Sequence, residues 1–364
     1  MLQPLSTFAI SLIAVAAGGH FSYRRLHNSL RRILYISFFE VLFAVGLVYL
    51  TLSIFPVSWP IEQVWPLALI LSVLAASTAP GTSVAIIREN HAKGPAVKTL
   101  LAVVSVDSSL CILLFAFVHS LLAAYFVHGE MDTGLAEGIL QAARQLIGSA
   151  VLGVGLGIIT TPLFEHHRFH NFSTVLAAIL FATGISSLFG FSALLTCLAY
   201  GAFLSNTSRE NERQLDALEP IEPLLYTAFF TLAGVGIHFE LLWVAGLPCV
   251  LYVLARGFGK GLGAMVGAVL SGCSARIRRS IPYGFMPQAG VVLGLVVIFE
   301  GDARIPAEVS SFVGTMILAA VTINEIIGPF FTRMALSHAW RCHAPKRRVW
   351  IAPVWSNFST KNSS

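Results

Sequence analysis

Long apolar segments alternate with short polar ones along almost the whole chain. About eleven of the segments suit helices that cross the roughly 30 Å hydrocarbon core of a bilayer. Their approximate bounds are 4–19, 33–55, 64–87, 99–126, 146–164, 172–188, 191–204, 221–237, 241–272, 281–299 and 309–334. The pattern predicts an all-α polytopic membrane protein.

Basic residues indicate how these spans are oriented, because cytoplasmic loops are enriched in Lys and Arg. If the N-terminus lies outside, the inward loops carry almost all the basic clusters, and the outward turns carry mainly acids. Reading 241–272 as two spans would move the cluster Arg276–Arg279 outside. We therefore predict one span there, and a cytoplasmic C-terminus in what we expect to be a bacterial inner membrane.

Composition supports the membrane class and excludes several functions. The chain is 56% hydrophobic and only 11% charged, too apolar for a water-soluble domain. The net charge of +5 reflects scattered loop residues, so we predict no nucleic-acid partner. The five cysteines form no CxxC pair, and neither HExxH nor GxSxG occurs. We predict no metal, no cofactor and no enzymatic activity, and no signal peptide, since the first apolar segment lacks a basic leader.

The segment 74–115 contains two features that are unusual inside a membrane. Its first apolar run is interrupted at Thr78-Ala79-Pro80-Gly81-Thr82, where proline removes a backbone donor. Its second run carries Asp107 near the middle, where a carboxylate is costly unless it is paired or wet. A broken helix beside an intramembrane acid provides freed backbone groups and a titratable ligand, which together predict an ion site.

A second interrupted segment repeats this arrangement near the C-terminus. The interruption is Gly284–Gly290, and the following span carries Glu325. Seven spans separate the two breaks, so the broken helices cross the membrane in opposite directions. Paired interruptions in inverted halves point to a transporter binding site at the bilayer midplane.

At these residues the sequence resembles the monovalent cation–proton antiporters, in particular their bacterial sodium/proton and potassium-efflux branch. The resemblance is carried by STAPGTSVAIIREN, KTLLAVVSVD, LARGFGK, MPQAGVVLGLVV and INEIIGPFFTRMAL, in the family's order and spacing. It implies a core bundle with two crossed broken helices, a dimerisation bundle, and alternating-access exchange of Na⁺ or K⁺ against H⁺. It also implies a homodimer in the lipid bilayer.

The resemblance also assigns expected roles to particular residues. The helix after the first break usually carries two adjacent acids, and Asp107 falls on the first position and Ser108 on the second. The first acid is typically paired with a basic residue, for which Arg256 falls at the expected place. In the same stretch we expect Lys260 to reach the inner interface and Gly257–Gly263 to allow close helix packing.

Two departures from the family leave a second hypothesis open. Ser108 is a hydroxyl where an ion-binding acid is usual, and Met1 falls just before what resembles the third helix, so the chain looks N-terminally shortened. A degenerate, non-transporting sensor or partner-binding protein of the same fold is therefore the alternative. The exchanger region is predicted to cover residues 1–338, followed by a short basic tail at 339–364.

Further polar residues complete the candidate site. Thr78 and Thr82 are candidate ion ligands beside the first break, although such hydroxyls also cap half-helices. Gln288 either faces the cavity or satisfies freed backbone groups. Glu40 and Glu325 match acids that recur in the resembling family, with Glu325 expected to be mainly structural. The loop 165–171 holds three histidines, which we interpret as a headgroup-level loop rather than a metal or pH-sensing site.

Overall fold

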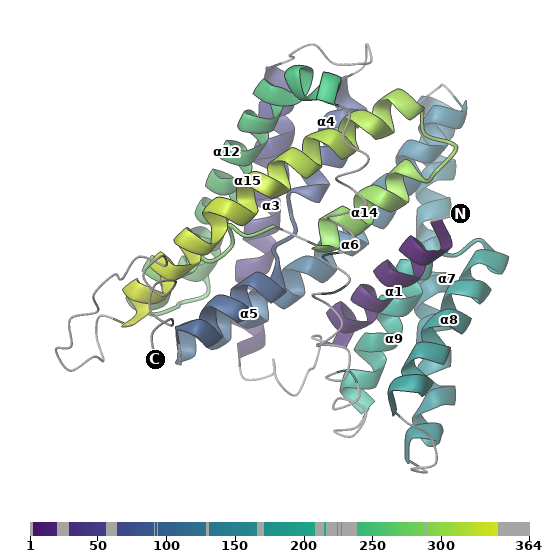
Figure 1. Ribbon diagram of the computed structural model, residues 1–364, viewed down its shortest axis with the longest axis horizontal. Helices are drawn as coiled ribbons and strands as arrows, with labels where there is room; N and C mark the ends of the chain where they lie inside the picture. Colours follow the sequence, from purple (N-terminus) through teal and green to yellow (C-terminus); the bar gives the residue numbers. More distant parts are fainter. Residues whose placement is uncertain are drawn as a thin grey trace, which may run out of the picture.

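The computed structural model describes residues 3–19, 29–55, 64–90, 92, 94–128, 131–165, 171–207, 215, 224, 227, 239–288 and 290–340. Every regular element in these ranges is helical (Figure 1). The elements are α1 (Gln3–Gly19), α3 (Leu30–Ile54), α4 (Val64–Leu74), α5 (Pro80–Glu89), α6 (Pro95–His128), α7 (Met131–Glu165), α8 (Asn171–Phe189), α9 (Ala193–Thr207), α12 (Phe239–Leu270), α13 (Ala275–Ser280), the 3₁₀ turn η3 (Ile281–Tyr283), α14 (Gly290–Glu300) and α15 (Ala307–Trp340).

Ten of the eleven predicted spans correspond to helices in this structure. The remaining one, 221–237, lies outside the described residues except for Leu224 and Thr227, and the histidine loop 166–170 and the tail 341–364 lie wholly outside them. Five helices are long and apolar enough to cross a membrane, and five shorter apolar helices accompany them. The ambiguous segment 241–272 forms one helix, α12, as predicted.

The helices form two groups that lie side by side (Figure 1). In the first, α3, α4, α12, α14 and α15 pack on one another. In the second, α1, α7, α8 and α9 pack together, and α6 contacts members of both groups. Small residues allow the closest approaches, because a Cβ added to Gly18 would lie 2.1 Å from the carbonyl oxygen of Leu198.

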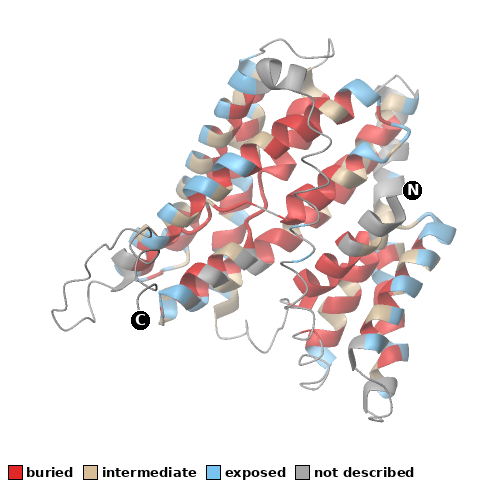
Figure 2. Ribbon diagram, viewed as in Figure 1, coloured by how far each residue is buried: buried red, intermediate tan, exposed pale blue. Residues whose placement is uncertain are grey.

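Both predicted interruptions are present, and they meet in the centre of the first group. The helix α4 ends at Leu74, the chain is non-helical to Ala79, and α5 begins at Pro80, where a missing N–H costs nothing at the first helical position. The second break separates η3 from α14. The Ala79 N–H donates to the Pro287 carbonyl across 3.0 Å, so the two breaks touch directly. The ribbon around them is mostly buried (Figure 2).

Candidate functional site

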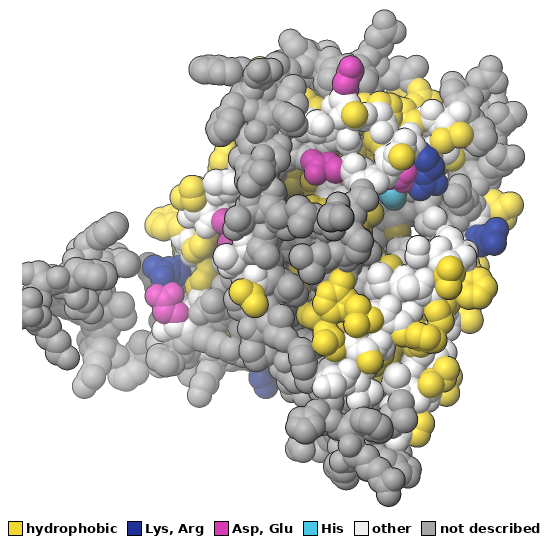
Figure 3. Space-filling view, turned by 45° about the vertical axis from the view of Figure 1, so that its right-hand side comes forward, with side chains coloured by type: hydrophobic (Ala, Val, Ile, Leu, Met, Phe, Trp, Pro, Cys, Tyr) yellow, Lys and Arg dark blue, Asp and Glu magenta, His cyan; other side chains and the backbone are white. Residues whose placement is uncertain are grey.

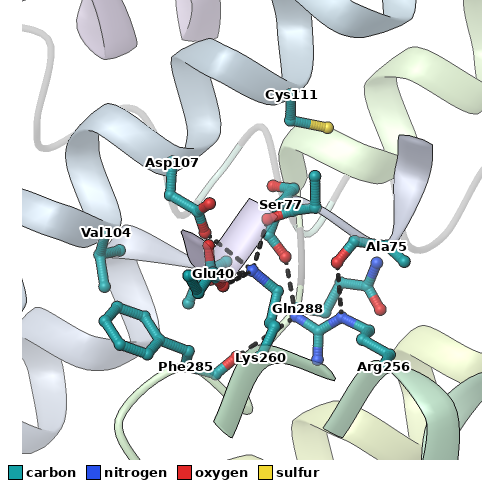
Figure 4. A network of polar contacts seen from close by, with 12 residues as sticks. Glu40, Ala75, Ser77, Val104, Asp107, Cys111, Arg256, Lys260, Phe285 and Gln288 are labelled. Carbon is teal, nitrogen blue, oxygen red and sulfur yellow. Dashed lines mark hydrogen bonds and ion pairs between the residues drawn. The ribbon is translucent and has the colours of Figure 1, made fainter. Parts of the chain in front are cut away.

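Arg256 satisfies backbone carbonyls on both breaks. From α12, its guanidinium donates to the carbonyl oxygens of Ala75 at 3.2 Å, Ser77 at 2.7 Å and Met286 at 2.8 Å. The side chain is fully buried and points into the crossing (Figure 4). Helix ends leave carbonyls without partners and carry partial negative charge. A planar guanidinium with several donors is suited to satisfy them.

The expected direct pairing of Arg256 with Asp107 is therefore wrong for this structure. The donors of Arg256 point to main-chain oxygens of the breaks. Its charge still interacts with Asp107 and Glu40 over a longer distance. Sequence spacing identified the right helix and the right region, but not the right cation.

Lys260 is the cation that pairs with Asp107. Its ammonium Nζ lies 2.9 Å from Asp107 Oδ2 and also contacts Glu40 Oε1. It further donates to the Ala76 carbonyl at 2.5 Å and to Thr78 Oγ1 at 3.0 Å. The ammonium thus joins three transmembrane helices and the first break (Figure 4).

The expectation that Lys260 reaches the inner interface is also wrong, because the side chain is fully buried. A lysine can extend to the interface only when it faces lipid or lies near a helix end. Lys260 follows Arg256 by four residues, and residues at that spacing share one face of a helix. The buried face that places Arg256 in the crossing therefore places Lys260 there too. This spacing was a signal that sequence reasoning could have used.

Hydroxyl groups connect Asp107 to the first break. Thr78 donates to Asp107 Oδ2 at 2.5 Å. Ser108 donates to the Thr78 carbonyl at 2.9 Å, with its own helix carbonyl at Val104 a second acceptor at 3.2 Å. Asp107, Ser108 and Thr78 are all fully buried. The Ser108 hydroxyl therefore links the first break to α6 by a hydrogen bond.

Two carboxylate oxygens in the site have no hydrogen-bond partner among the described residues. They are Asp107 Oδ1 and Glu40 Oε2. A buried acceptor without a partner is costly, and carboxylate oxygens are ligands that hard cations prefer. Two acids and two bases, Lys260 and Arg256, balance in charge when all four are ionised. The site can therefore hold a further cation only if Lys260 moves away from these oxygens or one of the four charges changes.

Gln288 belongs to the second break and satisfies freed backbone. Its amide donates to the Leu74 carbonyl at 2.9 Å and to the Tyr252 hydroxyl at 3.0 Å. Its own oxygen accepts from Asn324 Nδ2 at 2.9 Å. Of the two roles left open for Gln288, the structure shows this one. Sequence reasoning missed Tyr252 and Asn324, since single uncharged polar residues carry no distinctive pattern.

Thr82 and Glu325 pair with each other rather than with Asp107. Thr82 Oγ1 lies 3.1 Å from Glu325 Oε2, and both side chains are half-buried. The helix α15 reaches this position because it packs tightly on the second break. A Cβ added to Gly328 would lie 2.8 Å from the backbone of Pro287. Thr82 and Glu325 thus form a second polar contact beside the crossing.

A cavity of about 760 Å³ lies between the two groups of helices, lined from α1, α6, α7, α8, α9 and α14. His119, Asp302 and Arg304 line its rim, where basic, acidic and histidine side chains gather beside a hollow (Figure 3). Arg304 Nη2 lies 2.6 Å and His119 Nε2 lies 3.1 Å from Asp302 Oδ2. Burial alone would raise the pKa of Asp302, but the adjacent His119 imidazole and the hydrogen bonds from Arg304 hold that pKa below its ordinary range.

The crossed interrupted helices and the buried ion pair between them define a secondary transporter. The chain belongs to the sodium/hydrogen exchanger family, whose transmembrane model matches residues 1–334. The predicted family and the helical antiporter-like fold are confirmed. Both are those of a transporter and not of an enzyme, as predicted.

Solved structures show the same fold. The sodium proton antiporter MjNhaP1 from Methanocaldococcus jannaschii at pH 8 matches with a TM-score of 0.71 and 17% identity, covering 94% of this chain and 85% of that chain. A three-dimensional electron-microscopy map of the same antiporter matches with a TM-score of 0.67 and 17% identity, covering 93% and 85%. A comparison with curated protein sequences found no match.

Proposed function

We propose that this chain exchanges a monovalent cation, Na⁺ or K⁺, for protons by alternating access, and that cation and proton compete at Asp107. Membership of the sodium/hydrogen exchanger family supports cation/proton exchange. The observation that carries the residue assignment is the buried contact of Lys260 with Asp107 at the crossing of the two broken helices. A titratable acid at that place is accessible to either membrane face when one half of the fold moves against the other.

Charge balance gives the exchange a simple form. Lys260 neutralises Asp107 when no other cation is bound, and either a metal cation or a proton can replace it. The unpaired Asp107 Oδ1, the unpaired Glu40 Oε2 and the hydroxyl oxygen of Thr78 are the proposed ligands of the metal cation. Because these oxygens lie at one ammonium group, the cation must displace Lys260 from at least one carboxylate.

The other predicted site residues receive supporting roles in this proposal. Ser108 positions the Thr78 carbonyl, and Arg256 keeps the two breaks together while balancing charge. Thr82 and Glu325 form a half-buried hydrogen bond next to the ion site. Gln288 holds the second break against the first through its hydrogen bond to the Leu74 carbonyl.

Orientation and assembly are part of the same proposal. The basic loops support an outside N-terminus and a cytoplasmic C-terminus, and the resemblance to the antiporters supports a homodimer. Na⁺ or K⁺ and H⁺ are then the transported partners.

Dequenching of a pH-sensitive dye in everted membrane vesicles tests the proposed exchange. Addition of NaCl or KCl to acidified vesicles should restore fluorescence with the wild-type chain, and not with Asp107→Asn. Choline chloride serves as the control for ionic strength. Equal responses of wild type and Asp107→Asn would remove Asp107 from the mechanism. Absence of any cation response across neutral and alkaline pH would instead assign the ion pair a fixed structural role, in a non-transporting protein of this fold.

A further inference from the structure

A second large cavity lies beside the crossing, between α12, α15 and the segment around η3. Its volume is about 840 Å³, and most of its lining is apolar. Phe258 and Leu262 of α12 form an exposed wall. On the α15 side, Ile327 and Phe331 form the opposite wall. We call this the α12–α15 groove.

Glycines on α12 show that the groove is not a by-product of helix packing. A Cβ on Gly259 or Gly263 would lie 2.7 Å or 2.3 Å from a backbone oxygen of α3, so these glycines are needed for that contact. Gly257 and Gly261 occupy the other face. A Cβ on Gly257 would meet only Met286, at 3.5 Å, and one on Gly261 only Pro282, at 3.8 Å. Both are ordinary contacts, so helix packing does not require these two glycines, and their missing side chains leave the groove open.

Two exposed arginines lie at one end of the groove. Arg278 and Arg279 come from α13 and line the cavity. Arg278 Nε donates to the Cys273 carbonyl at 2.7 Å, which holds its guanidinium in place. None of the ion pairs among the described residues involves either arginine. Paired guanidinium groups present several donors to the oxygens of a phosphate.

Two residues that line the groove also take part in the hydrogen bonds around the ion site. Met286 lines the groove, and its carbonyl accepts from Arg256. Asn324 also lines it and donates to Gln288 of the second break. A molecule lying in the groove would therefore contact residues that hold the crossing together.

We propose that the α12–α15 groove binds one anionic phospholipid. Its phosphate is held by Arg278 and Arg279, and one acyl chain runs past Gly261 to Gly257. The thirteen residues from Gly257 to Val269 are separated by twelve rises of about 1.5 Å and span about 18 Å of helix, close to one leaflet's half of a roughly 30 Å hydrocarbon core. The basic end lies on the side predicted to be cytoplasmic, where arginines meet anionic lipids. This binding does not depend on the proposed exchange.

Native mass spectrometry of the purified full-length chain tests the proposal, by titration with phosphatidylglycerol or phosphatidylcholine. We expect one phosphatidylglycerol to bind at least ten-fold more tightly than phosphatidylcholine. The double substitution Arg278→Gln/Arg279→Gln should remove this preference. The matched control is Arg31→Gln/Arg32→Gln, which removes the same charge from an exposed pair on α3, outside the groove.

A second variant separates groove filling from charge. Gly261→Leu should lower phosphatidylglycerol binding at least ten-fold with both arginines present. Gly246→Leu, at a position on α12 with no atom within 4 Å of an added Cβ, should leave binding unchanged. Equal retention of both lipids, or equal loss with the Arg31/Arg32 control, would overturn the proposal. A shift of Gly261→Leu from dimer to monomer in light scattering would do the same, because it would make the groove an interface between copies.

Discussion

Lys260 Nζ lies 2.9 Å from Asp107 Oδ2 and also contacts Glu40 Oε1, with all three side chains fully buried. One ammonium therefore pairs with two carboxylates on two other helices, and Arg256 supplies the second positive charge that balances them. Removing one partner from a buried ion pair usually costs about 3–5 kcal/mol, because the remaining charge is left uncompensated. The geometry makes Lys260 the residue on which both acids depend.

Lys260→Met should consequently destabilise the protein more than Asp107→Asn. The lysine substitution leaves two buried carboxylates without a counterion, whereas Asp107→Asn leaves Lys260 paired with Glu40. We expect a loss of about 3–5 kcal/mol for Lys260→Met, measured as a lower thermal unfolding midpoint in detergent. The double substitution Lys260→Met/Asp107→Asn should recover part of that loss. A double variant that is additive would show that the two residues are not coupled.

Arg256→Lys should not act as a conservative change. Arg256 donates to carbonyls on both breaks at once, and a lysine has a single ammonium that cannot reach both. Each hydrogen bond from a charged donor contributes about 1.5–3 kcal/mol, so we expect a loss of about 2 kcal/mol in stability and no exchange in vesicles. Normal exchange by Arg256→Lys would show that the bridging of the breaks is dispensable.

Ser108→Asp restores the acid that related antiporters are expected to carry. In this chain the change removes the hydroxyl that donates to the Thr78 carbonyl and adds a negative charge to a balanced site. We expect a lower unfolding midpoint at low salt, and a larger rise on adding NaCl or KCl than the wild type shows. Choline chloride at matched ionic strength is the control. An equal response to all three salts would show that the added acid binds no cation.

Sequence reasoning located the fold and the region of the site, because interruptions and buried acids are visible in an apolar background. Asp107 and both breaks were found in this way. The pairing was not found, since Arg256 and Lys260 share one helix face and either could have reached Asp107. Which one does so depends on how far α12 lies from each break. That distance depends on the contacts of Gly259 and Gly263 with α3. The glycine pattern predicts a close helix contact, but not which helix makes it.

Gly263 and Gly257 lie on the same helix, but an added methyl group should destabilise the protein only at Gly263. A Cβ on Gly263 would lie 2.3 Å from the Phe39 carbonyl oxygen and 2.7 Å from the Cα of Glu40, so Gly263→Ala must push α3 away from α12. Because Glu40 pairs with Lys260 across this contact, we expect a loss of about 2 kcal/mol, typical of overpacking, and weakened exchange. Gly257→Ala is the matched control and should be neutral or slightly stabilising. Equal effects of both changes would show that the close approach is not needed.

The contacts of Asp302 with His119 and Arg304 predict how stability depends on pH at the rim of the 760 Å³ cavity. The adjacent His119 imidazole and the hydrogen bonds from Arg304 outweigh burial and lower the pKa of Asp302 in the folded state. A carboxylate with a lowered folded pKa stabilises the protein above its unfolded pKa of about 3.9, and this contribution is lost as the pH falls through the folded pKa.

Asp302→Asn should therefore cost on the order of 1 kcal/mol at neutral pH. The difference in unfolding midpoint from the wild type should not narrow between pH 8 and about pH 4, and should narrow only below it. Glu308→Gln, at an exposed acid in the first turn of α15, is the control. A difference that already narrowed between pH 8 and pH 5 would mean that a group other than Asp302 controls this rim.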